Sequence, residues 1–230
     1  VGQPYCTVNN GFLVRGRSIV PTDKNRIALR TPTRCTNYGT DQMVALLEWL
    51  GRQVSKDYGS PEYQKVRLLV GDVSSPRGGC LPGRGGRRGH ASHTTGQDVD
   101  LGLFVAKARG TVPDRFDSKF DAASNWWLLK QIFKNPFTCI KVIFLDRRHI
   151  NKLAKIARGD PEWAMFGRFI RHMPGHRNHV HLRIGNLPGG AGCMTDAHPE
   201  LEEAEDINND VDEMVEQITA SIAQQSTVVT

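Results

Sequence analysis

The sequence predicts an α+β fold, with a mostly antiparallel central sheet and flanking helices. Segments with the apolar period of a helix are interspersed with short apolar segments typical of strands. Several of these strands lie close to turns, which favours antiparallel pairing over a doubly wound parallel sheet. The length of 230 residues allows one domain with a sizeable core, and a hydrophobic content of 39% is ordinary for a globular protein.

The first half of the chain predicts one helix and two strands. Residues 1–38 are polar, with turn residues and few periodic signals. A helix follows over residues 41–58, because Thr40 can cap it and Asp41 suits its positive first turn. Its apolar stripe consists of Met43, Leu46, Leu47, Leu50 and Val54. Buried strands are expected within 65–74 and 97–104, with a loop rich in glycine and arginine between them.

The second half predicts three helices and two strands. The helices are expected at 121–135, 147–159 and 160–173, the last with Asp160 as cap and Pro161 at its first position. The helix at 147–159 is expected to end at Gly159. Its inward residues are expected to be Ile150, Leu153, Ile156 and Ala157. The strands are expected within 138–146 and 178–184.

Charge and periodicity divide the chain into two parts, a body at 1–190 and an acidic helical extension at 191–230. Residues 1–184 carry a net charge of +16 and residues 185–230 a net charge of −10. A basic body suggests an anionic partner, such as nucleic acid or an acidic polymer. Alternatively, the tail neutralises part of the body, in the same molecule or in a neighbour. An apolar stripe at spacings of three and four predicts an amphipathic tail helix that docks on the body, with partner binding or dimerisation as the alternative: Leu201, Ala204, Ile207, Val211, Met214, Ile218 and Ile222.

The cysteines and the ends of the chain bear on its compartment. The five cysteines include no C-x-x-C pair, which disfavours a cysteine zinc finger. Their dispersal fits one or two long-range disulfides in an exported protein, and the alternative is five reduced thiols in a cytosolic one. No apolar run reaches the roughly 18 residues of a membrane span. The first residue is Val, so the chain is expected to be processed or trimmed.

Two histidines of an H-x-H pattern are the first candidate site residues. On the strand at 178–184, His179 and His181 point to the same face while Val180 enters the core. His176 lies in the preceding turn. An accidental cluster is the alternative, because short motifs often mislead.

A second group of ligands lies earlier in the chain. His93 is in a loop, and Asp100 follows seven residues later on a strand. Two imidazoles and one carboxylate make a three-ligand site with an open fourth position, which suits a catalytic zinc ion. Asp98 shares the strand face of Asp100 and is expected to orient a ligand histidine. The chain contains no S-x-x-K and no G-x-S-x-G, so the main serine routes to acyl transfer lack support.

Residues 92–100, SHTTGQDVD, and 176–181, HRNHVH, resemble the penicillin-insensitive murein endopeptidases. These enzymes belong to a metallopeptidase superfamily with lysostaphin, the D-Ala-D-Ala dipeptidases and the hedgehog amino-terminal domain. The resemblance runs from about residue 11 to Arg183 and implies a fold like those of hedgehog and the D-Ala-D-Ala peptidases. The acidic tail looks like an addition to the family pattern.

The resemblance also implies a role for each candidate residue. His93, Asp100 and His181 would bind the catalytic zinc, His179 would be the base for the attacking water, and His176 would help to stabilise charge on the substrate oxygen. A second metal position would involve His90, Asp146 and His149. The alternatives are a plain helix cap for Asp146 and a surface residue in the first helical turn for His149.

The resulting hypothesis is a zinc metallopeptidase, periplasmic or secreted, that hydrolyses D-alanyl–diaminopimelate cross-links in peptidoglycan. It implies no nucleic-acid partner. Arg84, Arg87 and Arg88 would hold acidic groups of the polymer, or else form an ordinary solvated loop. The competing hypotheses are a D,D- or L,D-carboxypeptidase on the same polymer, a metal-dependent nuclease, and a binding protein with a vestigial zinc site.

Overall fold

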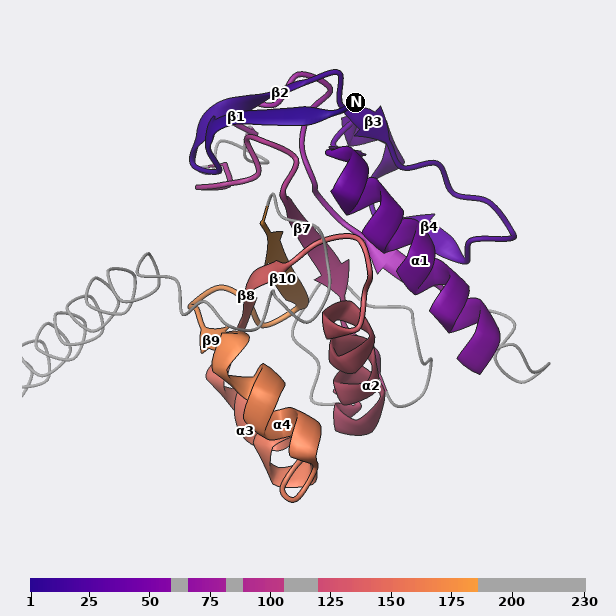
Figure 1. Ribbon diagram of the computed structural model, residues 1–230, viewed down its shortest axis with the longest axis vertical. Coiled ribbons are helices and arrows are strands. Elements are labelled where there is room, and N and C mark those ends of the chain that lie inside the picture. Colours follow the sequence, from indigo (N-terminus) through magenta and orange to yellow (C-terminus); the bar gives the residue numbers. More distant parts are fainter. Residues whose placement is uncertain (59–65, 82–88, 106–119, 186–230) are drawn as a thin grey trace, which may run out of the picture. The chain divides into compact units, whose positions relative to one another are not determined.

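The computed structural model describes residues 1–58, 66–81, 89–105 and 120–185 (Figure 1). The chain divides into two units, Val1–Met194 and Thr195–Thr230. The predicted acidic helix and the arginines at positions 84, 87 and 88 lie outside the described residues. These features therefore stay predictions, as does the domain boundary near residue 190.

A six-stranded sheet forms the centre of the described body. Its strands, in spatial order, are β4 (Ile27–Leu29), β6 (Leu68–Val70), β7 (Asp98–Gly102), β10 (His179–Ile184), β8 (Ile140–Leu145) and β9 (Ile170–His172). The three central pairings, β6–β7, β7–β10 and β10–β8, are antiparallel, and the two outer pairings are parallel. The predicted α+β class with a mostly antiparallel sheet is confirmed.

Each α-helix begins at a side chain that accepts a backbone N–H from the first turn. The helices are α1 (Asp41–Asp57), α2 (Ala122–Phe133), α3 (Arg147–Ile156) and α4 (Pro161–Phe166), capped in turn by Thr40, Asp121, Asp146 and Asp160. Each cap contributes about 1 kcal/mol to the stability of its helix. The predicted caps Thr40 and Asp160 are confirmed.

The two faces of the central strands differ, and this difference positions the site. Val99, Leu101, Val180 and Leu182 are at most 1% exposed and belong to the same core as the buried stripe of α1. Because side chains alternate along a strand, the residues between them point to the opposite face. On β7 and β10 that face carries aspartate and histidine. The core therefore anchors the backbone from which these polar side chains project.

The amino-terminal residues contain more strands than the sequence indicated. β1 (Gln3–Thr7) and β2 (Asn10–Val14) form an antiparallel hairpin, and β3 (Arg17–Ser18) pairs with β5 (Tyr38–Gly39). A short 3-10 helix, η1 (Pro32–Arg34), follows β4. Most residues of the hairpin are exposed, so its strands show no apolar alternation that a sequence pattern could reveal.

Two expectations about the third and fourth predicted helices were wrong. The helix predicted over 160–173 ends at Phe166, and the chain continues through a 3-10 turn, η3 (Gly167–Phe169), into the edge strand β9. Pairing of β9 with β8 outweighs the local helix pattern here. In α3, Leu153 and the capping residue Ala157 are buried, but Ile156 is 46% exposed instead of facing inward. Ile156 lies at the rim of the buried face.

Three of the five cysteines are described as free thiols. Cys6, Cys35 and Cys80 are exposed free thiols. Of the two remaining cysteines, Cys139 is described and Cys193 lies outside the described residues, so the expected disulfides stay a prediction. In the described part of the chain, no helix is both long enough and apolar enough to cross a bilayer.

Candidate metal centre

The register between β7 and β10 brings the two candidate ligand strands together. Asp100 pairs with His181, and Asp98 pairs with Arg183, on the same face of the sheet. His179 lies two residues before His181 on β10, opposite Gly102. Side chains directly opposite in an antiparallel pair have Cβ atoms about 5 Å apart, which is close enough to share an ion.

His93 reaches the same place from the loop before β7. Its backbone has a positive φ of 70°, which is rare for a residue other than glycine. The conformation is held because the His93 N–H donates to Asp98 Oδ2 at 3.2 Å, and its Nδ1 lies 3.0 Å from the carbonyl oxygen of Val73. His93 is fully buried. Local strain of this kind is common at functional sites, where the surrounding structure enforces it.

One oxygen of Asp100 is the centre of the cluster. Three imidazole nitrogens approach Asp100 Oδ1: His93 Nε2 at 3.3 Å, His181 Nδ1 at 3.3 Å and His179 Nε2 at 3.5 Å. The sequence placed these four residues far apart in two segments. The fold brings them together around one carboxylate, and His90 Nδ1 lies 3.8 Å from its other oxygen, Asp100 Oδ2.

Backbone and carboxylate acceptors set the orientation of two of these imidazoles. Asp98 Oδ1 lies 2.9 Å from His181 Nε2 and accepts a hydrogen bond from Arg183 Nε at 2.7 Å. When His181 is neutral and donates its Nε2–H to Asp98, the lone pair of Nδ1 faces Asp100. In the same way, donation of the His93 Nδ1–H to Val73 leaves the Nε2 lone pair free to bind a cation. Such outer contacts are usual around histidine ligands of metals.

The residues fit a metal ion because buried polar atoms in the cluster lack partners. Within the described part of the chain, His93 Nε2 and Asp100 Oδ1 are buried and have no hydrogen-bond partner. An unsatisfied buried atom costs about 1–3 kcal/mol, and a bound cation would remove this cost for both atoms at once. Ligand atoms of His90, His93 and Asp100 also lie within 4.8 Å of one another. Nitrogen and carboxylate donors suit zinc.

The charges of Asp100, Asp98 and His181 are coupled. Burial would raise the pKa of Asp100, but the facing imidazoles hold it well below its ordinary value. Burial would also raise the pKa of Asp98, and the contacts with His181 and Arg183 lower it instead. Burial alone would lower the pKa of His181, yet its contacts with Asp100 and Asp98 raise it to about 9. Without metal, His181 is therefore a positively charged imidazolium, protonated on both ring nitrogens, at neutral pH.

The pKa of His179 is shifted in the opposite direction to that of His181. Burial lowers its pKa to about 4, and the neighbouring positive charges of His176, His181 and Arg30 oppose the favourable effect of Asp100. Its Nδ1 lies 2.7 Å from Asn178 Oδ1 and donates a hydrogen bond to this oxygen. The side chain is 16% exposed. His179 is therefore neutral at pH 7, with the lone pair of Nε2 directed to the cluster.

His176 borders the cluster beside His179. The two ring centroids lie 4.8 Å apart. Its Nδ1 lies 3.1 Å from the carbonyl oxygens of both Met173 and Pro174. Burial, followed by the charge of His181, lowers the pKa of His176. The neutral ring thus donates from Nδ1 and can only accept at Nε2, and it becomes a donor at Nε2 when protonated.

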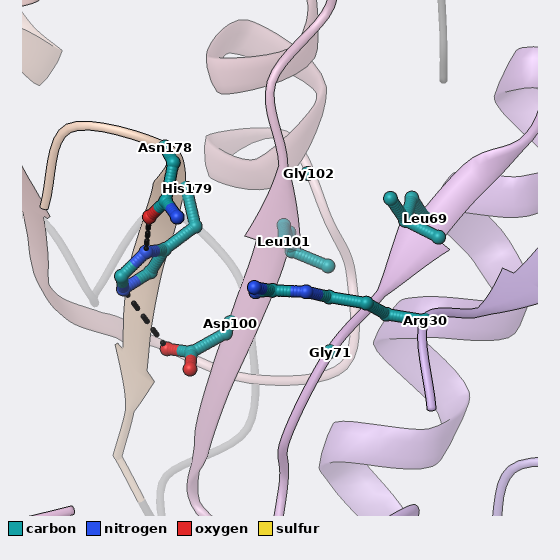
Figure 2. Close-up of a pocket in the computed structure, with 8 residues that line it drawn as sticks. All are labelled: Arg30, Leu69, Gly71, Asp100, Leu101, Gly102, Asn178 and His179. Carbon is teal, nitrogen blue, oxygen red and sulfur yellow. Dashed lines mark hydrogen bonds and ion pairs between the residues drawn. The ribbon is translucent and has the colours of Figure 1, made fainter. Parts of the chain in front are cut away.

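A pocket opens next to these residues (Figure 2). It is lined by Arg30, Leu69, Gly71, Asp100, Leu101, Gly102, Asn178 and His179. Figure 2 shows the Arg30 side chain extending from the end of β4 toward Asp100 and His179. A guanidinium is charged at every physiological pH and matches carboxylate or carbonyl oxygens. No local pattern singles out Arg30, because β4 is far from the histidine motifs along the chain.

Asp72 is a second residue that the sequence did not indicate. Its carboxylate contacts Arg34, Thr36 and His90, and it is 8% exposed. Burial would raise its pKa, but the contacts with His90, Thr36 and Arg34 lower it to about 2. Asp72 lies two residues after the end of β6, and a polar residue just beyond a buried strand was the one available signal.

Asp146 and His149 have other partners among the described residues. Asp146 caps α3 through its bond from the Arg148 N–H at 2.9 Å, and its Oδ2 lies 3.4 Å from Arg177 Nε. His149 Nε2 lies 2.9 Å from the carbonyl oxygen of Arg177, and its ring stacks on Phe120 at 4.1 Å. The alternative of a surface position for His149 is wrong, because the side chain is fully buried. A metal role for this pair stays a prediction.

Comparison with known proteins gives one consistent result. A family model described as penicillin-insensitive murein endopeptidase matches residues 5–228. A protein of that name from Klebsiella pneumoniae subsp. pneumoniae is 28% identical over 211 residues, covering 86% of this chain and 71% of the relative. One from Haemophilus influenzae is 26% identical over 221 residues, covering 83% and 70%. One from Escherichia coli O1:K1 is 28% identical over 197 residues, covering 79% and 66%.

Proposed function

Because the chain belongs to the penicillin-insensitive murein endopeptidase family, we propose that it is a zinc-dependent hydrolase of peptide cross-links in peptidoglycan. The bond proposed is the one between D-alanine and diaminopimelate. The observation that carries the proposal is the convergence of His93 Nε2 and His181 Nδ1 on Asp100 Oδ1, each at 3.3 Å, with two of these buried atoms lacking hydrogen-bond partners.

His93, Asp100 and His181 would hold the zinc ion. Their nitrogen and oxygen donors match the usual set of a catalytic zinc site with one open position. When bound, zinc supplies Lewis acidity, which polarises a carbonyl group and favours ionisation of water near neutral pH. Among the described residues, the groups that approach Asp100 Oδ1 are imidazoles and include no serine or cysteine. The proposed reaction therefore forms no acyl-enzyme in which a penicillin could be trapped.

His179 is proposed as the general base. Its low pKa keeps it neutral at pH 7, and the bond from its Nδ1 to Asn178 fixes the lone pair on Nε2. Nε2 can then take a proton from the attacking water beside Asp100. The protonated imidazole would next donate this proton to the leaving amine. General acid–base catalysis of this kind contributes typically about 10²–10⁴-fold to the rate.

Two residues are proposed to stabilise negative charge on the substrate. His176 can donate a hydrogen bond from Nε2 only in its protonated form, because the Nδ1–H of the neutral ring is directed at backbone carbonyls. Arg30 lines the pocket beside His179 and is a permanent cation. We therefore assign Arg30 to a carboxylate of the stem peptide. His176 is assigned to the substrate oxygen, whose developing negative charge would favour the imidazolium that burial disfavours in the free protein.

A carboxypeptidase acting on the same polymer is the second candidate. Its supporting observation is again Arg30, because a carboxypeptidase needs a cation for the terminal carboxylate next to the bond that it cleaves. The two activities share His93, Asp100, His179 and His181. Their products differ: an endopeptidase separates a cross-linked dimer into two muropeptides, whereas a carboxypeptidase releases free D-alanine.

The proposed substrate lies outside the cytoplasmic membrane, so we place the protein in the periplasm or in the medium. In such an oxidising compartment a Cys139–Cys193 disulfide would form. Mass spectrometry after alkylation tests this pairing. Three modified thiols before reduction and five afterwards are expected, and five modified thiols before reduction would exclude the disulfide.

The function is tested with purified protein and cross-linked muropeptides. We expect conversion of dimers into monomers, loss of this activity with a chelator, and its return with zinc. His179→Ala should lower the rate by about 10²–10⁴-fold, while Asn151→Ala, on the exposed surface of α3, should leave it unchanged. Cleavage that survives removal of metal would contradict the proposal. Release of D-alanine without dimer cleavage would select the carboxypeptidase.

A further inference from the structure

We propose that Asp72 is a positioning residue that fixes His90 in the metal centre: it accepts the Nε2–H of His90 and so directs His90 Nδ1 toward Asp100. The inference rests on the proposed metal-dependent function and deepens it by adding His90 to the residues that would bind the ion. It assigns a role to a residue outside the histidine and aspartate motifs, and it identifies what holds His90 in place.

The backbone places Asp72 beside Asp100. The Asp100 N–H donates to the carbonyl oxygen of Asp72 at 2.9 Å, and the Gly71 N–H donates to the carbonyl oxygen of Asp100 at 2.7 Å. These two bonds tie the segment after β6 to the strand that carries the central carboxylate. The position of Asp72 relative to the site is therefore set by the sheet and does not depend on its own side chain.

The carboxylate of Asp72 is also fixed in orientation. Thr36 Oγ1 donates to Oδ1, and Arg34 Nη1 donates to Oδ2. Both donors come from the segment that follows β4, and Arg34 ends η1. A carboxylate held by a hydroxyl and a guanidinium keeps its charge and its rotamer, which are the properties needed in an acceptor that orients an imidazole.

His90 completes this arrangement. Its Nε2 lies 3.0 Å from Asp72 Oδ2, while its Nδ1 lies 3.8 Å from Asp100 Oδ2. The side chain of His90 is 31% exposed, so packing alone restrains it less than the fully buried His93. His93 and His181 face the other oxygen of Asp100. His90 therefore approaches the central carboxylate from a separate side, and Asp72 is the contact that selects its lone-pair nitrogen.

A purely structural role for Asp72 is the competing explanation, because its bonds to Arg34 and Thr36 also hold η1. The two explanations differ in their coupling to His90. If Asp72 acts through His90, its removal changes metal affinity only while His90 is present. If it acts only on the fold, its removal lowers stability and affects metal affinity to the same extent in either background.

The experiment is a double-mutant cycle on the full chain, with zinc affinity measured by calorimetric competition against a chelator. The proteins are wild type, Asp72→Asn, Asp72→Ala, His90→Ala and the two double variants. Removal of such an orienting carboxylate typically weakens metal binding about 10–100-fold. We expect this loss in Asp72→Ala, a smaller one in Asp72→Asn, and no additional loss when either change is added to His90→Ala.

Asp160→Asn is the matched control for stability. Asp160 also bonds several donors, including Trp126 Nε1 and Lys130 Nζ, but it belongs to α4 and not to the site. It should lower the melting temperature without changing zinc affinity. Wild-type affinity in both Asp72 variants, or losses that multiply with that of His90→Ala, would overturn the inference.

A measurement on the unaltered chain covers the case in which the Asp72 variants fail to fold. Long-range proton–nitrogen NMR on the metal-free protein, above the pH range in which imidazoles titrate, reports the tautomer of each histidine. We expect His90 to carry its proton on Nε2, and a proton on Nδ1 would overturn the inference. If the wild type binds no zinc, the proposed function fails, and the tautomer still decides the role of Asp72.

Discussion

His181 Nε2 lies 2.9 Å from Asp98 Oδ1, a contact between two buried side chains on adjacent strands. It leaves His181 Nδ1 as the nitrogen that faces Asp100. The same carboxylate accepts from Arg183 Nε and from the backbone N–H of His93. Asp98 therefore orients two proposed ligands, His181 and His93, and also neutralises the charge of Arg183.

Asp98→Asn should weaken zinc binding by about 10–100-fold, because the amide keeps only one of the two acceptor oxygens that orient His181 and His93. It should also destabilise the fold by about 3 kcal/mol or more, because the half-buried Arg183 is left without its carboxylate. Calorimetry and urea unfolding measure the two effects. Asp41→Asn, in the first turn of α1, serves as the control. A variant with wild-type zinc affinity would show that Asp98 does not orient the ligands.

Zinc binding should release a proton from His181. The pKa of this imidazole is about 9 in the metal-free chain, so at pH 7 it is protonated and must lose its proton to bind metal. The apparent affinity should rise about tenfold per pH unit below pH 9 and level off above it. Calorimetry in buffers of different ionisation enthalpy counts the protons. Proton uptake, or an affinity independent of pH between 7 and 9, would be incompatible with this assignment.

His179 should make the metal-free protein less stable in acid. Its pKa is about 4 in the folded chain and about 6.5 in the unfolded chain. Protons therefore bind the unfolded chain more readily, and the stability contributed by neutral His179 above pH 6.5 is lost as the pH falls from about 6.5 to about 4. His179→Gln should gain up to roughly 3 kcal/mol relative to wild type over this range. Parallel stability curves for the two proteins in urea would refute the shift.

His149→Phe tests whether the pair Asp146 and His149 holds a metal. His149 stacks on Phe120 inside the body and contacts the carbonyl oxygen of Arg177. Phenylalanine keeps the stacking and removes the hydrogen bond and both ring nitrogens. We expect a loss of about 1 kcal/mol in stability and, if the predicted second metal position exists, a loss of one zinc per chain. Elemental analysis of the two proteins measures this, and an unchanged zinc content would exclude a metal at His149.

Local sequence patterns predicted those parts of the fold that local physics controls. The helix after Thr40 and the strand of His179 and His181 follow from capping and from the alternation of side chains. The approach of Asp100 to His181 follows from strand pairing, which no short pattern encodes. The resemblance to a known family supplied that grouping, and the register of β7 with β10 provides its physical basis.

The remaining site residues depend on contacts between distant segments. The contacts of Asp72 come from Thr36 and Arg34 in one segment and from His90 in another. None of these residues is within 15 positions of Asp72 in the sequence. Arg30 reaches the pocket only because β4 pairs with β6 at the edge of the sheet. The strand β9 was missed for a similar reason, since its pairing with β8 outweighs a local helix pattern.

The central claim is that His93, Asp100 and His181 bind one zinc ion. A crystal structure of the zinc-loaded protein, with anomalous scattering recorded at the zinc edge, tests it most directly. We predict a peak about 2.0–2.2 Å from His93 Nε2, an oxygen of Asp100 and His181 Nδ1. A zinc peak that contacts none of these atoms, or a cluster without zinc in protein that cleaves peptidoglycan, would contradict the account.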